Sequence, residues 1–109
     1  MPKRRKTTRN PAPSGAHQNA LRRRIRELEN DGAKLESAAL PGHEQPDPIG
    51  KYKRRPDAVM TKRWKPIIIE SEDESKLSTR HHKDQMSTFR RSASQRGGRA
   101  EVVTFKKEK

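Results

Sequence analysis

The chain has 109 residues, of which 27% are hydrophobic and 4% aromatic, and its formal net charge is +13. Low hydrophobicity with high net charge is typical of disordered chains, because burying apolar area at about 25 cal/mol per Å² does not offset a backbone entropy cost of roughly 1–2 kcal/mol per residue. The composition therefore predicts a mostly intrinsically disordered chain with no independent globular core. The absence of cysteine excludes disulfides and thiolate metal sites.

Residues 1–18 are predicted to form a basic disordered tail. A compact basic cluster in this tail resembles a nuclear import signal, formed by Lys3, Arg4, Arg5 and Lys6. A tail that binds phosphates nonspecifically is the alternative. No apolar run follows these charges, so we expect neither a secretory signal nor a membrane protein. The resemblance implies binding to a nuclear import receptor and a location in the nucleus or nucleolus.

Residues 19–40 are predicted to form an Arg-rich amphipathic helical segment. Leu21, Ile25 and Leu28 follow the helical period, which predicts a short helix over 19–30, and a helical turn is expected over 33–40. Arginines grip phosphate with two donors at once, and Arg-rich helices fold on RNA. The predicted phosphate contacts are Arg22, Arg23, Arg24 and Arg26. An alternative is that the apolar stripe binds a protein or a second copy.

Residues 41–66 are predicted to form a basic linker, because Pro and Gly interrupt the segment repeatedly. Tyr52 and Trp64 lie among basic residues, and this combination favours binding of single-stranded nucleic acid, with bases stacked on the rings. The cations concerned are Lys53, Arg54, Arg55, Arg63 and Lys65. Anchoring of Trp64 in a pocket of a protein partner is an equally open interpretation.

Residues 67–75 follow Pro66 in the sequence PIIIESEDES, with an extended segment expected over 66–70. A strand of a small core and an aggregation-prone window are two interpretations of the isoleucines. In the absence of a core, we favour a third, in which the segment adds as an edge strand to a partner's sheet. The segment resembles a SUMO-interacting motif, with an apolar core of Ile67, Ile68 and Ile69 and an acidic flank of Glu70, Glu72, Asp73 and Glu74. The resemblance implies a small ubiquitin-like modifier as partner and phosphorylation of Ser71.

Residues 76–109 are predicted to form a basic Ser/Arg-rich disordered tail with one extended segment over 101–105. A single Arg-Gly-Gly triplet places Arg96 and Arg99 among the predicted RNA contacts. Ser94 follows Arg91 by three positions, which suggests a kinase site. Lys106 lies in FKKE, which resembles an acceptor site for the same modifier.

The sequence also bears on catalysis. The carboxylates near residue 70 lie in a polar run where nothing is expected to desolvate them, and the histidines lack metal-ligand spacing, so we expect no enzyme, cofactor or metal site. The favoured function is a basic nuclear adaptor that binds nucleic acid, with RNA or a ribonucleoprotein favoured over a specific DNA site. The alternatives are a non-enzymatic protein-interaction module (chromatin, chaperone or small viral regulatory factor) and a structural subunit of a ribonucleoprotein particle.

Overall fold

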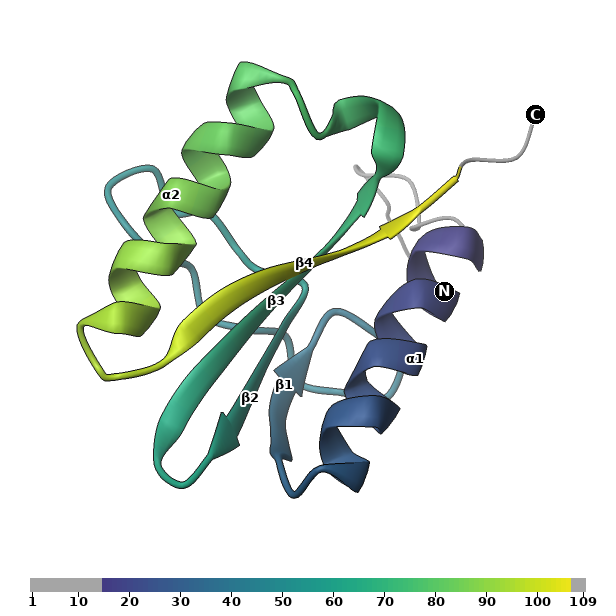
Figure 1. Ribbon diagram of the computed structural model, residues 1–109, viewed down its shortest axis with the longest axis vertical. Helices are drawn as coiled ribbons and strands as arrows, with labels where there is room; N and C mark the ends of the chain where they lie inside the picture. The colour runs from purple at the N-terminus through teal and green to yellow at the C-terminus, as the bar shows by residue number, and fades with distance from the viewer. Residues whose placement is uncertain (1–14, 107–109) are drawn as a thin grey trace, which may run out of the picture.

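The computed structural model describes residues 15–106, which form two helices, four strands and one 3-10 turn. Figure 1 shows the helices on opposite sides of a twisted sheet. In chain order the elements are α1 (Gly15–Asn30), β1 (Lys34–Ala38), β2 (Ala58–Lys62), β3 (Lys65–Asp73), η2 (Glu74–Lys76), α2 (Arg80–Ser94) and β4 (Arg99–Phe105).

The sheet is mixed, with the strand order β1-β2-β3-β4. The strands β1, β2 and β3 pair antiparallel, whereas β4 lies parallel to β3. Parallel strands need a long crossover connection, and α2 provides it between β3 and β4. The strand β3 is therefore central, with a hydrogen-bonded neighbour on each side.

The face of the sheet that carries α1 holds the larger part of the core. Leu21, Ile25 and Leu28 form the buried stripe of α1, at 0–6% exposure, and pack against the sheet. Side chains of a strand alternate between its faces, so Ile67 and Ile69 of β3 both point toward α1. The apolar stripe of α1 thus covers this face of the central strand.

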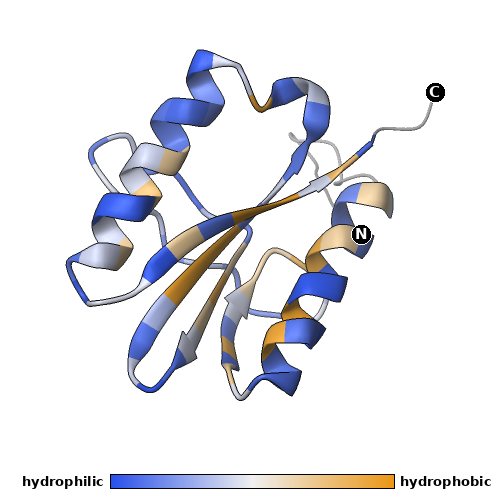
Figure 2. Cartoon of the chain, in the orientation of Figure 1, coloured by the Kyte–Doolittle hydropathy of each residue, from blue (hydrophilic) through white to orange (hydrophobic). Residues whose placement is uncertain are grey.

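The opposite face carries a second, smaller core under α2. Ile68 points to this side and packs with Met86, Phe89 and Ala93 of α2, all four at 0–1% exposure. The helix begins after Thr79, whose hydroxyl oxygen accepts a hydrogen bond from the His82 backbone N–H. Figure 2 shows hydrophobic colour along the middle of the sheet and hydrophilic colour on much of the outer helix surfaces. The three consecutive isoleucines therefore contribute side chains to both cores.

The expectation of a mostly disordered chain without a core is wrong. The chain has few apolar residues, but they recur with the helical period of 3.6 on α1 and α2 and form a continuous run in the central strand. Overall composition counts core and solvent-facing positions together, so it does not show that the apolar residues are concentrated at core positions. Two local expectations also differ from the structure: residues 34–38 form β1 rather than a helical turn, and the tail predicted over 76–109 contains α2 and β4.

The junction between α2 and β4 requires glycine. A Cβ on Gly98 would lie 1.9 Å from the Pro66 carbonyl oxygen, far inside contact distance. Gly97, just before it, has a φ of +76°, in the region that favours glycine. This close approach brings the start of β4 against the start of β3.

Residues 15–106 contain no helix with the length and hydrophobicity needed to cross a membrane.

Candidate carboxylate site

The strand register brings two carboxylates face to face at one end of the sheet. Ala58 of β2 pairs with Ile69 of β3, so the antiparallel register places Asp57 opposite Glu70. The Asp57 N–H donates to the Ile69 carbonyl oxygen over 3.1 Å, and the Ser71 N–H donates to Asp57 Oδ2 over 2.8 Å. Glu72 follows two residues after Glu70 and shares its face of β3. Three acidic side chains thus gather where β2 begins and β3 ends.

Glu70 is the buried member of this carboxylate cluster, defined as Asp57, Glu70 and Glu72. Its exposure is 6%, and the Gln85 side-chain amide on α2 donates to its Oε2. Burial, followed by the charge of Asp57, a side-chain hydrogen bond with Asp57 and the charge of Glu72, raises the pKa of Glu70 to about 10. The carboxyl is therefore protonated at neutral pH.

Each helix contributes one histidine to the rim of the cluster. His17, near the start of α1, places Nε2 at 3.3 Å from Asp57 Oδ2, and the hydrogen bond with Asp57 raises the pKa of this histidine. His82, on α2, places Nδ1 at 3.4 Å from Glu72 Oε2 and is 6% exposed. Each face of the sheet therefore places one histidine beside an outer carboxylate.

The cluster opens to solvent on the side of its outer members. The side chains of Asp57 and Glu72 retain 18% and 23% exposure, whereas Glu70 lies deeper. Carboxylate oxygens are the ligands that Mg²⁺ and Mn²⁺ prefer. Within residues 15–106, no group of three or more His, Asp or Glu side chains is arranged so that it could hold a metal ion.

The predicted arginines of α1 have two different environments. Arg22, Arg23 and Arg26 are exposed. Arg24 instead bonds to Glu101 of β4, with 2.5 Å between Nε and Oε2, and to Glu27, and these bonds raise its pKa. Arg24 thus ties α1 to β4, while its neighbours face solvent.

The predicted aromatic residues lie apart, on two different loops. Tyr52 is 70% exposed, with Arg54 at 5.7 Å from its ring centroid, in the loop between β1 and β2. In that loop Lys53 and Arg55 are also exposed. Trp64, 95% exposed, occupies the turn between β2 and β3. The fold places Arg63, Lys65 and Arg99 around one hollow beside this turn, and Arg96 lies exposed nearby in the chain.

The predicted docking segment lies in the interior. Ile67, Ile68 and Ile69 are 0–2% exposed, and both edges of their strand are already paired, so the folded chain offers no free edge strand here. In the acidic flank, Glu70 and Glu72 belong to the carboxylate cluster. Asp73 caps the short η2 turn, in which Glu74 is exposed.

The predicted modification sites differ in access. Ser71 is 3% exposed and its hydroxyl donates to the His17 carbonyl oxygen over 3.0 Å, so it is not accessible to a kinase in the fold. Ser94 and Lys106 are exposed. The predicted import cluster of Lys3, Arg4, Arg5 and Lys6 lies outside the described residues.

Four residues of the site escaped the sequence analysis: His17, Asp57, His82 and Gln85. A signal existed for Asp57, which follows Pro56 and precedes a short apolar run, AVM. A second signal was Glu-Ser-Glu directly after an apolar run, since polar residues at the end of a buried strand commonly line sites. The expectation that nothing desolvates these carboxylates is wrong, because Glu70 is buried.

Comparisons with protein-family models, with curated proteins and with solved structures found no match.

Proposed function

We propose that this protein hydrolyses phosphodiester bonds of nucleic acid with the help of a divalent cation that Asp57 and Glu70 would hold, with Glu72 as the general base. The observation that carries the proposal is the buried Glu70 carboxyl, which lies beside the carboxylates of Asp57 and Glu72. Such an arrangement costs folding free energy, because burial and like charge both oppose ionisation. Proteins retain such costs where a function requires them.

A bound cation would offset this cost. Ligands must be deprotonated to bind metal, so a bound cation would take the place of the Glu70 proton and would offset the negative charge of Asp57 and Glu70. When bound, a divalent cation polarises a phosphoryl oxygen and lowers the pKa of a water ligand. Cation affinity should accordingly rise with pH, because Glu70 loses its proton only with difficulty.

The chain's own groups provide for the proton transfers of hydrolysis. The water oxygen forms a bond to phosphorus, the bridging P–O bond breaks, and the leaving oxygen gains a proton. Glu72 lies at the solvent-accessible side of the cluster, where it would accept the water proton and release it to solvent, and solvent would protonate the leaving oxygen. His82, at 3.4 Å from Glu72, stabilises the carboxylate in the orientation this requires. Gln85 fixes Glu70 through its bond to Oε2.

Charge favours nucleic acid as the substrate. The net charge is +13, and exposed arginines and lysines occur on α1, on the loop between β1 and β2 and around the β2–β3 turn. A polyanion releases counterions when it binds such a surface, so affinity should fall steeply with salt. The nucleic-acid binding expected from the sequence thus remains part of the proposal, with the backbone phosphate as both the bound and the reacting group.

The proposal is tested by incubating the full chain with labelled single-stranded DNA, duplex DNA and RNA, each with Mg²⁺, Mn²⁺, Ca²⁺ or a chelator. We expect cleavage with Mg²⁺ or Mn²⁺ and none with the chelator. Asp57→Asn and Glu72→Gln should lower the cleavage rate at least about 100-fold, the scale of a lost general base or cation ligand. Glu29→Gln, an exposed carboxylate at the other end of α1, is the matched control and should cleave normally.

A second candidate is the non-enzymatic adaptor that the sequence suggests. The contacts of His17 with Asp57 and of His82 with Glu72 favour it, because each outer carboxylate already has a histidine partner without a cation. This candidate predicts salt-dependent binding to RNA or DNA that is the same with Mg²⁺ and with chelator. Cleavage would then be absent for the wild type under all conditions, which would contradict the hydrolase proposal.

A further inference from the structure

The turn between β2 and β3 has residues that its backbone does not favour. Lys62 pairs with Lys65 across a two-residue turn formed by Arg63 and Trp64, whose φ angles are +54° and +73°. Two-residue hairpin turns with positive φ at both positions favour Asn-Gly, since a side chain with a Cβ is strained there. A bulky aromatic residue in this conformation is an outlier, and such outliers cluster at functional sites.

The same turn presents the indole to solvent. Trp64 is 95% exposed, although Trp buries more apolar area than any other side chain when it is placed inside. Met60 and Ile67, which pair across the same hairpin, are 0% and 2% exposed. The hairpin therefore has an apolar core along its length and an uncovered aromatic ring at its tip.

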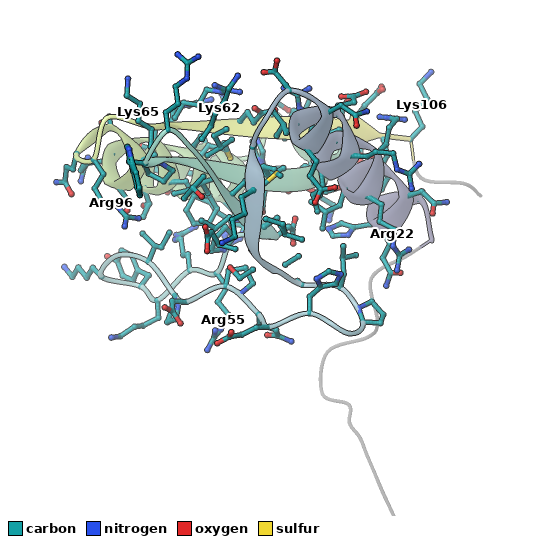
Figure 3. All side chains as sticks on the ribbon, turned by 90° about the horizontal axis from the view of Figure 1, so that it is seen from below. Arg22, Arg55, Lys62, Lys65, Arg96 and Lys106 are labelled. Atoms are coloured by element: carbon teal, nitrogen blue, oxygen red, sulfur yellow. The ribbon has the colours of Figure 1, made fainter. Side chains whose placement is uncertain are left out.

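A basic hollow lies beside the turn. Its lining includes Lys62, Arg63, Lys65 and Arg99 with the two glycines before β4, and no acidic residue. Lys62 also pairs with Asp31 at 2.7 Å, and Arg99 pairs with Glu101 at 3.3 Å. Figure 3 shows the Lys62 and Lys65 side chains extending from the same end of the domain, away from the ribbon. Gly98 lets the Pro66 backbone pack closely against the start of β4, which holds the two chain segments of the hollow together. A chain with regularly spaced negative charges and flat apolar groups fits this combination.

We propose that the tip of the β2–β3 hairpin is a second nucleic-acid contact, at which Trp64 stacks on an unpaired base while Arg63, Lys65 and Arg99 bind the adjacent phosphates. Base stacking on an aromatic ring combined with cations along the backbone is the general mode of single-strand binding. Charge complementarity selects nucleic acid over an apolar protein pocket, because the hollow beside the turn is basic throughout its charged lining.

The binding contact itself does not depend on the proposed hydrolysis. Only its effect on the choice of substrate rests on that proposed function. Trp64 and Glu70 are six residues apart on one extended strand, which corresponds to about 20 Å at 3.3 Å per residue. The hairpin tip would thereby select substrates with unpaired bases at that distance from the cut.

The experiment uses fluorescence, because Trp64 is the single tryptophan of the chain. The full chain carrying Glu70→Gln is titrated, in chelator, with a single-stranded DNA oligonucleotide and with an abasic oligonucleotide of equal length. We expect saturable quenching by the first and at least about tenfold weaker quenching by the second, since one stacked base contributes on that scale. Because neither cleavage nor a cation is involved, a failure here is distinct from a failure of the proposed hydrolysis.

A turn-optimised variant separates binding from folding. Arg63→Asn with Trp64→Gly installs the preferred turn sequence, so the variant should unfold at the same or a higher urea concentration than the parent protein. Its affinity for the oligonucleotide, measured by anisotropy of a label on the DNA, should fall at least about tenfold. Glu29→Gln serves as the unaffected control.

Three results would overturn the proposal. Unchanged affinity of the turn-optimised variant excludes the contact. Equal quenching by normal and abasic oligonucleotides excludes stacking. Quenching by a poly-glutamate peptide but not by DNA assigns the tip to an acidic protein surface instead.

Discussion

The replacement of Glu70 by Gln removes the ionisable group from the carboxylate cluster and keeps its shape. The pKa of this carboxyl rises from 4.5 to about 10 because the fold buries it beside Asp57 and Glu72. Its contribution to stability is fully present below pH 4.5 and is lost as pH rises toward 10, since the unfolded chain ionises first. The wild-type free energy of unfolding should therefore decrease with pH across this interval.

The magnitude follows from the difference between the two pKa values. Protonating the carboxyl at pH 7 against an unfolded pKa of 4.5 costs about 3 kcal/mol, at 1.36 kcal/mol per pH unit. Glu70→Gln avoids this cost. The new amide still offers an oxygen to Gln85, and its NH₂ group faces the Asp57 carboxylate. We expect the variant to be more stable than the wild type by up to about 3 kcal/mol at pH 7 and by little at pH 4.5.

The assay is urea unfolding followed by far-UV circular dichroism at several pH values between 4.5 and 9 for both proteins. The difference between their unfolding free energies isolates Glu70, because His17, which also has a raised pKa, is present in both. The gain in stability should accompany complete loss of cleavage. A variant that is less stable at neutral pH, or a difference that does not change with pH, would refute the claim that Glu70 is protonated in the fold.

Three further predictions concern the fold. Ile68→Ala, at a site with 0% exposure, should cost about 2–5 kcal/mol of unfolding free energy in urea titrations, whereas an exposed docking residue would cost almost nothing. Gly98→Ala should cost at least about 1–3 kcal/mol, because the new methyl group meets the Pro66 carbonyl oxygen at 1.9 Å; an unchanged thermal midpoint would show that this junction is not tight. Arg24→Ala breaks the link to Glu101, whose side chain is 20% exposed; it should cost about 1 kcal/mol in low salt and less in high salt, and a loss independent of salt would contradict an ion pair.

Local patterns predicted parts of the fold. The 3.6-residue spacing of Leu21, Ile25 and Leu28 placed a helix over 19–30, within the observed α1. The isoleucine run placed an extended segment inside β3. The partners of these elements were not apparent, because β1 and β2 are only five residues long and are rich in polar side chains on their outer face. The prediction of disorder therefore followed the average composition rather than these local patterns.

The candidate site could not be predicted in the same way, because its members come from four separate elements. His17, Asp57, Glu70 and His82 are 12 to 40 residues apart in the sequence, and only the register of β2 with β3 and the placement of a helix on each face bring them together. Burial of Glu70 depends on that assembly as well. The local signals were Asp57 before an apolar run and Glu70 directly after the isoleucines, and the acidic run around Glu70 favoured a solvated interpretation.

The rate of cation-dependent cleavage under single-turnover conditions tests the central claim most directly. Wild-type protein and Glu70→Gln, purified side by side, are mixed with labelled oligonucleotide, and the reaction is started with Mg²⁺ or Mn²⁺. The account predicts cleavage by the wild type, abolished by chelator, and at least about a 100-fold slower reaction for the more stable variant. Equal rates for the two proteins, or no cleavage by the wild type with either cation, would contradict it.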